Sequence, residues 1–236
     1  MTWIFLYGGL SLTLPQQGDL QLFKNVNIMK KHLSFLILPI VMTVIIFLVF
    51  IVERLFMTSF ADAGILPRTV SGLKGIFFGP LIHGDWSHLI SNLSAFPVLL
   101  AMLTLVYRRN YVRIFAALYV MTGLLVWLFA RPAYHIGVSG VIYALASFLF
   151  FGGIMSKRIG AIAISLIIIF LYGGMVWGIL PSQPHVSWES HALGAVAGFV
   201  CGLIFVKDHP KKEPKDSDYD YKIPGFYDKT STGENF

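Results

Sequence analysis

The stretch "HIGVSGVIYAL", His135 to Leu145, decides the fold class of this protein. It places a serine, Ser139, between two glycines and in front of a run of apolar residues. Such a run favours a helix buried in a membrane, where a polar hydroxyl is costly and usually marks a functional site. Two questions follow: whether the chain spans a membrane, and which other polar groups lie near this serine.

The composition answers the first question. The 236-residue chain is 56% hydrophobic and only 13% charged, and its mean hydropathy is +0.72. A soluble domain of this length could not cover so much apolar surface. Several almost uncharged runs are long enough to cross about 30 Å of hydrocarbon, which takes roughly 20 helical residues. We therefore predict an all-α polytopic membrane protein.

Six segments are expected to span the membrane: Leu33–Val52, Leu89–Val106, Tyr111–Ala130, Ser139–Gly153, Gly160–Leu180 and Trp188–Val206. The fourth is short and rich in glycine and alanine, which indicates a helix surrounded by other helices. The spans define a membrane domain over residues 33–206, preceded by an N-terminal segment, residues 1–32. The polar tail, residues 207–236, is predicted to be disordered. Because Met29 directly precedes two lysines and the first span, we expect translation to start there.

Lysines and arginines are divided unequally between the two sides of these spans. Eleven fall on one side: Lys24, Lys30, Lys31, Arg108, Arg109, Arg113, Lys157, Arg158, Lys207, Lys211 and Lys212. Four fall on the other: Arg54, Arg68, Lys74 and Arg131. The excess predicts that both termini are cytoplasmic and that the even-numbered spans begin at the outer face. The lack of a targeting leader favours a bacterial plasma membrane.

The formal net charge of +6 does not indicate nucleic-acid binding. The basic residues stand at the ends of apolar runs, without a basic patch that contains interleaved aromatics. This distribution is typical of loops that face anionic lipid.

Polar residues gather at the outer starts of the second, fourth and sixth spans. The second opens with "HGDWSHLISNL", which carries His83, His88 and Asn92. The fourth opens with Ser139, and the sixth opens with "HALGAVAG", which begins at His191. The distribution of loop charges and the positions of polar residues are independent observations, and both place these groups at one membrane depth.

Helical spacing groups these residues on shared faces. His88 stands four residues before Asn92, and Ser139 four residues before Tyr143, so each pair lies on one helix face. On the sixth span, a stripe of small residues follows His191, and the fourth span offers a matching small pair. These residues are Gly194 and Gly198 on the sixth span, and Gly140 and Ala144 on the fourth.

Packing the two small-residue faces together would bring the His191 imidazole beside the Ser139 hydroxyl. A base within hydrogen-bond reach is what a serine nucleophile needs to attack a carbonyl. The oxyanion formed in that attack needs hydrogen-bond donors, for which His88, Asn92 and the Ser139 backbone N–H are candidates.

Each residue also has a structural interpretation. A serine in a membrane helix can bond to its own backbone, Tyr143 can fill space, and His83 can brace the loop. Histidines near the interface, such as His135 and His185, favour contacts with lipid headgroups. The occurrence of polar groups at one depth on three helices favours a functional site over packing.

Several other classes fit less well. The chain has no H-E-x-x-H motif, and Asp85 and Glu189 have no evident partner, so no metal or other cofactor is expected. Ser139 does not lie in the G-x-S-x-G turn of soluble hydrolases. A transporter would place polar groups near the bilayer centre and often shows repeated halves, neither of which is evident.

From Gly64 to Val206 the chain resembles the rhomboid intramembrane serine proteases. "HGDWSHLISNL" is similar to the family's H-x-x-x-x-H-x-x-x-N, "GVSG" to its G-x-S-G, and "HALGAVAG" to its H-x-x-G-x-x-x-G. One departure is the first loop, where many bacterial members carry a Trp-Arg pair and this chain reads "SGLKGIFFGP".

The resemblance implies a six-helix rhomboid-like bundle with a Ser–His dyad and no third acid. Ser139 matches the nucleophile and His191 the general base, and His88 and Asn92 match the oxyanion-stabilising side chains. The supporting positions are Gly137 and Gly140 beside the nucleophile, Tyr143 beside the histidine, and His83 in a structural or water-retaining role.

The implied activity is hydrolysis of peptide bonds in or near transmembrane segments of other proteins. The family admits such substrates past the fifth helix and a cap loop, here Gly160–Leu180 and Leu180–Ser187. The alternative is a non-catalytic relative that binds or escorts membrane proteins. Such relatives usually lack the serine or the histidine, and this chain has both.

Overall fold

The computed structural model describes residues 34–157, 159–181 and 187–206. Within these ranges the chain is helical and contains no strand, and six helices are long and apolar enough to cross a membrane. The predicted all-α, six-helix class is therefore confirmed. The expected N-terminal segment, the proposed start at Met29 and the polar tail lie outside the described residues.

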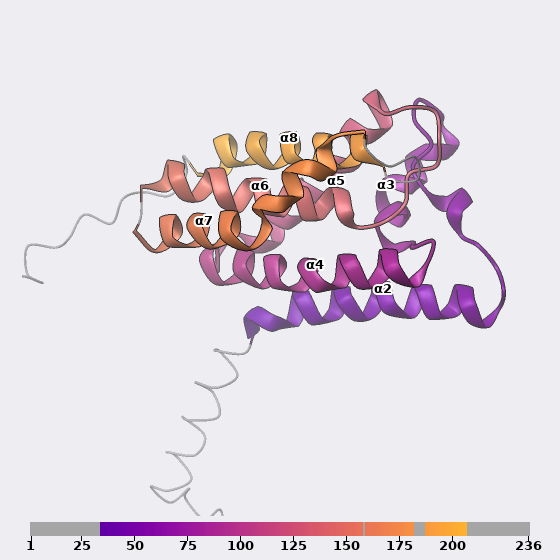
Figure 1. The fold of residues 1–236 in the computed structure, drawn as a ribbon, viewed down its shortest axis with the longest axis horizontal. Coiled ribbons are helices and arrows are strands. Elements are labelled where there is room, and N and C mark those ends of the chain that lie inside the picture. Colours follow the sequence, from indigo (N-terminus) through magenta and orange to yellow (C-terminus); the bar gives the residue numbers. More distant parts are fainter. Residues whose placement is uncertain (1–33, 158, 182–186, 207–236) are drawn as a thin grey trace, which may run out of the picture.

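The six long helices lie side by side (Figure 1). They are α2 (Ile37–Leu55), α4 (Trp86–Val106), α5 (Tyr111–Phe129), α6 (Ser139–Ser156), α7 (Ile159–Tyr172) and α8 (Trp188–Phe205). Short helices η2 (Ala61–Ala63), η3 (Ser71–Lys74), α3 (Gly75–Phe78) and η4 (Gly79–Leu81) connect α2 to α4, and η1 (Ser34–Leu36) precedes α2.

Several helix boundaries differ from the sequence prediction by about three residues, including the ends of α2 and α6, and two differences lie near the predicted site. Helix α4 begins at Trp86, three residues early, because the Asp85 carboxylate caps it by accepting a hydrogen bond of 2.9 Å from the His88 backbone N–H. The fifth span leaves α-helical geometry after Tyr172 and continues as a 3₁₀ helix, η5 (Gly173–Ile179). Adjacent glycines at 173 and 174 weaken the α-helix at that point.

Helix α6 forms the centre of the bundle. It packs most extensively on α8 and also contacts α7, α4 and α5. Half of the residues in its span are buried, against 17% for the outer spans that contain α2 and α7. The prediction that the fourth span is surrounded by other helices is confirmed.

Glycines set the close approach of α6 and α8. Gly194 lies against the backbone carbonyl of Gly140, and Gly198 against that of Ala144, so a Cβ at either α8 position would overlap main chain. The Ser147 hydroxyl adds a hydrogen bond of 2.7 Å to the Ala195 carbonyl. The predicted packing of the two small-residue faces is therefore present.

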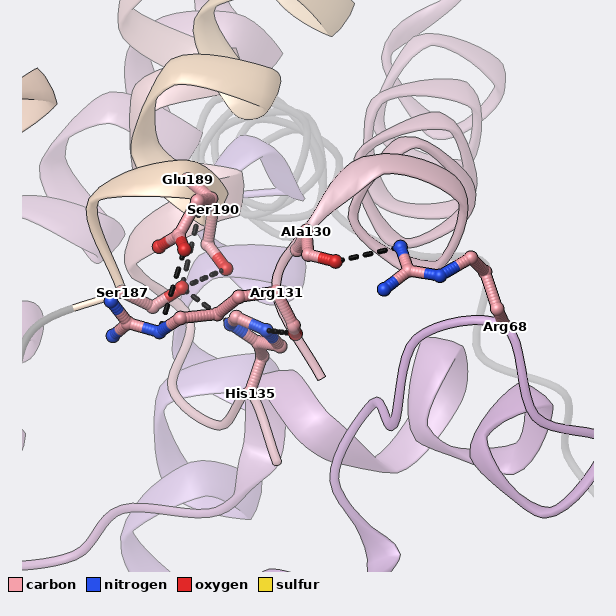
Figure 2. Close-up of polar contacts among 7 residues, drawn as sticks. All are labelled: Arg68, Ala130, Arg131, His135, Ser187, Glu189 and Ser190. Atoms are coloured by element: carbon pink, nitrogen blue, oxygen red, sulfur yellow. Dashed lines mark hydrogen bonds and ion pairs between the residues drawn. The ribbon is translucent and has the colours of Figure 1, made fainter. Parts of the chain in front are cut away.

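The α2–α4 connection is anchored on the end of α5. The Arg68 guanidinium donates to the Leu128 carbonyl at 3.2 Å. It also donates to the Ala130 carbonyl at 2.8 Å, and Figure 2 shows this second bond. In return, the Trp127 indole N–H donates to the Thr69 carbonyl at 2.8 Å. The loop thus has an arginine and a tryptophan as anchors, although they come from separate segments.

Candidate active site

The α6–α8 contact brings two predicted site residues together. The Ser139 Oγ lies 2.9 Å from the His191 Nε2. Ser139 is the first residue of α6, and His191 lies in the first turn of α8, so both are at the same end of the bundle. Ser139 is half-buried and His191 is buried.

The direction of this hydrogen bond follows from the other face of the imidazole. The His191 Nδ1 lies 2.8 Å from the backbone carbonyl oxygen of Gly178, which can only accept a hydrogen bond. The neutral imidazole therefore carries its proton on Nδ1, which leaves Nε2 as an acceptor. The Ser139 hydroxyl accordingly donates to Nε2.

Tyr143 supports the His191 ring from one side. The two rings stack with centroids 4.3 Å apart and an interplanar angle of 10°. The Tyr143 hydroxyl donates to the Met175 carbonyl at 2.6 Å, which fixes the phenol in that position. The histidine is therefore held on its face by α6 and on its edge by η5.

His88 and Asn92 flank the loop that precedes Ser139. Gly137 has a φ of +98°, and a Cβ built there would lie 2.5 Å from the His88 Nε2 and 3.6 Å from the Asn92 Nδ2. The Asn92 Nδ2 is buried and has no hydrogen-bond acceptor among the described residues. A side chain at 137 would overlap the His88 imidazole, so glycine lets the loop before Ser139 lie directly against His88 and close to Asn92.

His83 lies behind His88. Their ring centroids are 4.9 Å apart, and His83 is only 1% exposed. Burial, reinforced by the neighbouring His88, lowers the pKa of the His83 imidazole to about 4. His83 is therefore neutral at physiological pH, which suits a residue packed against another histidine.

His135 is wrongly predicted as a lipid-headgroup contact, because it is buried, and burial lowers the pKa of its imidazole. Its Nε2 donates to the Arg131 carbonyl at 3.0 Å, and its Nδ1 accepts from the Ser187 hydroxyl at 2.6 Å (Figure 2). Ser187 caps α8 by accepting from the Ser190 backbone N–H. The cluster ties the loop before Ser139 to the start of α8. His185 lies outside the described residues.

Two acidic residues have partners that the sequence did not reveal. Asp85 caps α4, and Glu189 pairs with Arg131 at 3.4 Å. In the described part of the chain, no three His, Cys, Asp or Glu side chains are grouped so that they could hold a metal ion.

Comparison with known proteins shows the family of the chain. Residues 68–208 match the model of the Rhomboid domain. The chain belongs to the rhomboid family. It is 33% identical over 169 residues to uncharacterized proteins of Mycobacterium bovis and Mycobacterium tuberculosis, which covers 68% of this chain and 70% of each relative. An uncharacterized protein of Mycobacterium leprae is 30% identical, with 68% and 67% covered.

The rhomboid match contains all the predicted site residues and begins after α2. Sequence reasoning about this rhomboid missed Gly178 and Met175, whose contribution is a backbone carbonyl. A carbonyl is present in every residue, so no side-chain pattern could have indicated them. The adjacent glycines 173 and 174 were a visible sign that the fifth span changes geometry near the site.

Proposed function

We propose that this rhomboid is an intramembrane serine endopeptidase that uses a Ser139–His191 dyad. The observation that carries the proposal is the 2.9 Å contact between the Ser139 hydroxyl and an imidazole nitrogen that is free to accept its proton. A nucleophile held on its base, with the base oriented by a third group, is the arrangement that covalent catalysis requires. Here the third group is a backbone carbonyl.

In the first half of the reaction, the Ser139 Oγ attacks the carbonyl carbon of a peptide bond, and the His191 Nε2 takes the hydroxyl proton. The tetrahedral intermediate collapses as His191 returns that proton to the leaving amine, which gives an ester on Ser139. In the second half, His191 deprotonates a water that attacks this ester. Collapse releases a carboxylic acid and restores the Ser139 hydroxyl.

The negative oxygen of each tetrahedral intermediate needs donors. We assign this role to the His88 imidazole, the Asn92 amide and the Ser139 backbone N–H. The position of His88 and Asn92 against the backbone of Gly137, two residues before Ser139, supports the assignment. The buried Asn92 Nδ2, which has no acceptor among the described residues, supports it further. Donors fixed in place before the charge develops lower the barrier because they need no reorganisation during the reaction.

The proposed substrates are other transmembrane proteins, cut in or near their spans. A peptide in an intact helix hides its carbonyls in the i to i−4 hydrogen bonds. Substrates should therefore carry glycine or proline near the cut, because these residues weaken the helix.

The proposed setting is a bacterial plasma membrane with both termini in the cytoplasm and the site open to the outer side. The division of basic residues, eleven against four, supports this orientation.

The test is replacement of the nucleophile. Ser139→Ala is expected to abolish cleavage of a transmembrane substrate with a helix-weakening site, and to abolish labelling by a fluorophosphonate probe. Expression and thermal stability should remain unchanged. The matched control is Ser91→Ala, which removes an exposed serine of α4 and should leave both activities intact. Labelling of the Ser139→Ala protein at the wild-type rate would contradict the proposal, and no labelling of the wild type would favour a non-catalytic binding role.

A further inference from the structure

The 3₁₀ helix η5 makes two hydrogen bonds to the residues around the dyad. The Gly178 carbonyl accepts from the His191 Nδ1–H at 2.8 Å, and the Met175 carbonyl accepts from the Tyr143 hydroxyl at 2.6 Å. One bond reaches α8 and the other reaches α6. The segment therefore bridges the two helices that carry Ser139 and His191.

The approach of η5 requires glycine at position 178. A Cβ there would overlap the Tyr143 hydroxyl and lie 3.2 Å from its Cζ and 3.3 Å from the His191 Nδ1. By contrast, a Cβ on Gly174, in the same segment, would meet nothing within 4 Å. Glycine at 178 is thus a condition of the contact with the imidazole, and glycine at 174 is not.

Helix η5 is also weakly held, because its geometry and its exposed side chains provide little stabilisation. It runs for seven residues as a 3₁₀ helix, although such helices seldom exceed four residues because their hydrogen bonds are poorly aligned. Its side chains at Val176 and Trp177 are 56% and 70% exposed, so they add little burial. The hydrogen bonds to the Gly178 and Met175 carbonyls therefore contribute much of what holds η5 in place.

We propose that Gly178 is the positioning residue of His191, and that the dyad is competent only while η5 is seated as in this structure. The inference rests on the proposed function and assigns the orienting role that an acid has in other serine hydrolases. When η5 moves away, the Nδ1 proton loses its acceptor. The imidazole can then rotate or carry its proton on Nε2, and the Ser139 hydroxyl loses its base.

The first experiment reads the tautomer directly in the wild-type protein. Nuclear magnetic resonance of ¹⁵N-histidine-labelled protein in lipid nanodiscs, with a His191→Gln sample for assignment, should show the His191 proton on Nδ1. In Gly178→Ala this signal should be lost or mixed with the other tautomer. In the matched control Gly174→Ala it should match the wild type.

The second experiment reads the catalytic consequence. Gly178→Ala should lower kcat for a transmembrane substrate and the rate of fluorophosphonate labelling by about 100-fold, since small misplacements of catalytic groups cost about that much. KM should stay within a few-fold, because the bond orients a group rather than binding substrate. Gly174→Ala should keep both rates.

Three outcomes would overturn this inference and leave the proposed function standing. The first is a reactive wild type whose His191 carries its proton on Nε2, and the second is a Gly178→Ala variant that keeps the Nδ1–H signal and full rates. The third is an equal loss in Gly174→Ala, because it would assign the effect to the segment in general. A wild type with the Nδ1–H signal that does not react with the probe would instead overturn the proposed function.

Discussion

Asn92 carries a buried amide nitrogen that has no hydrogen-bond partner in the described chain. This condition costs about 1–3 kcal/mol. On the proposed mechanism this donor bonds to the oxyanion, so it is satisfied only during the reaction. The stability of the resting protein is therefore lower than its packing would allow.

This argument predicts opposite effects on activity and stability for Asn92→Ala. The labelling rate should fall by about 100- to 1,000-fold, as for loss of one oxyanion donor. The melting temperature should stay the same or rise, because an unpartnered polar group is removed. Both are measured on the purified protein, by probe kinetics and by thermal unfolding in detergent.

The control for Asn92→Ala is Thr43→Val on α2, far along the sequence from the site. It removes a buried hydroxyl that, like the Asn92 amide nitrogen, has no partner in the described chain. It should keep the labelling rate and the stability. A marked loss of stability in Asn92→Ala would mean that the amide has a structural role instead.

At the scale of elements, the α6–α8 pair was predictable from the sequence because helical period is a local property. The spacing of Ser139 and Tyr143, and of His191 and Gly194, assigns helix faces without any knowledge of neighbours. The contacts of η5 and His135 were not predictable, because irregular segments have no period and their place depends on the finished bundle.

The pair also predicts the effect of adding one methyl group. In Gly194→Ala the new Cβ meets the Gly140 carbonyl, a main-chain atom that cannot turn aside. The helices must separate, at a cost of about 1–3 kcal/mol. We expect a lower melting temperature and a labelling rate reduced at least about tenfold, since Ser139 and His191 move apart.

Gly160→Ala is the matched control for this change. Gly160 lies on α7, where a Cβ would meet nothing within 4 Å. Its melting temperature and labelling rate should match the wild type. If Gly194→Ala and Gly160→Ala have the same melting temperature and labelling rate, the α6–α8 contact can accommodate a methyl group and the argument is wrong.

For the whole molecule, the loop end of the bundle is sensitive to acid. His83 is buried and neutral, and its pKa of about 4 lies below the usual 6.5 of the unfolded chain. Protons therefore favour the unfolded state below pH 6.5. Above pH 6.5 the His83 imidazole is neutral in both states and does not lower the free energy of unfolding. As the pH falls from 6.5 towards 4, the free energy of unfolding falls by up to about 3 kcal/mol.

The prediction is a melting temperature that falls between pH 6.5 and 4.5, with a shallower fall in His83→Gln. Buried His135, whose pKa is also lowered, should preserve part of the slope in the variant. Identical slopes for wild type and variant would show that His83 does not contribute.

The orientation of the molecule can be tested because its single cysteine, Cys201, is fully buried. In a Cys201→Ala background, one exposed residue on each side of α4 along the chain is replaced: Ser71→Cys, on η3 in the loop before α4, and Arg109→Cys, in the turn after it. The reagent is a maleimide that crosses the bacterial outer membrane but not the plasma membrane. On intact cells this maleimide should label residue 71 alone. Residue 109 should label only after the plasma membrane is opened, and the reverse pattern would contradict the proposed orientation.

The main-chain contact between Gly140 and Gly194 has a consequence for how such a protein can diverge. A side chain at position 194 would overlap the Gly140 carbonyl, so this glycine cannot be replaced gradually by larger residues. If the proposed function holds, adaptation to new substrates would fall to the outward surfaces of α2 and α7 and to the loops, where added side chains do not meet the α6–α8 contact.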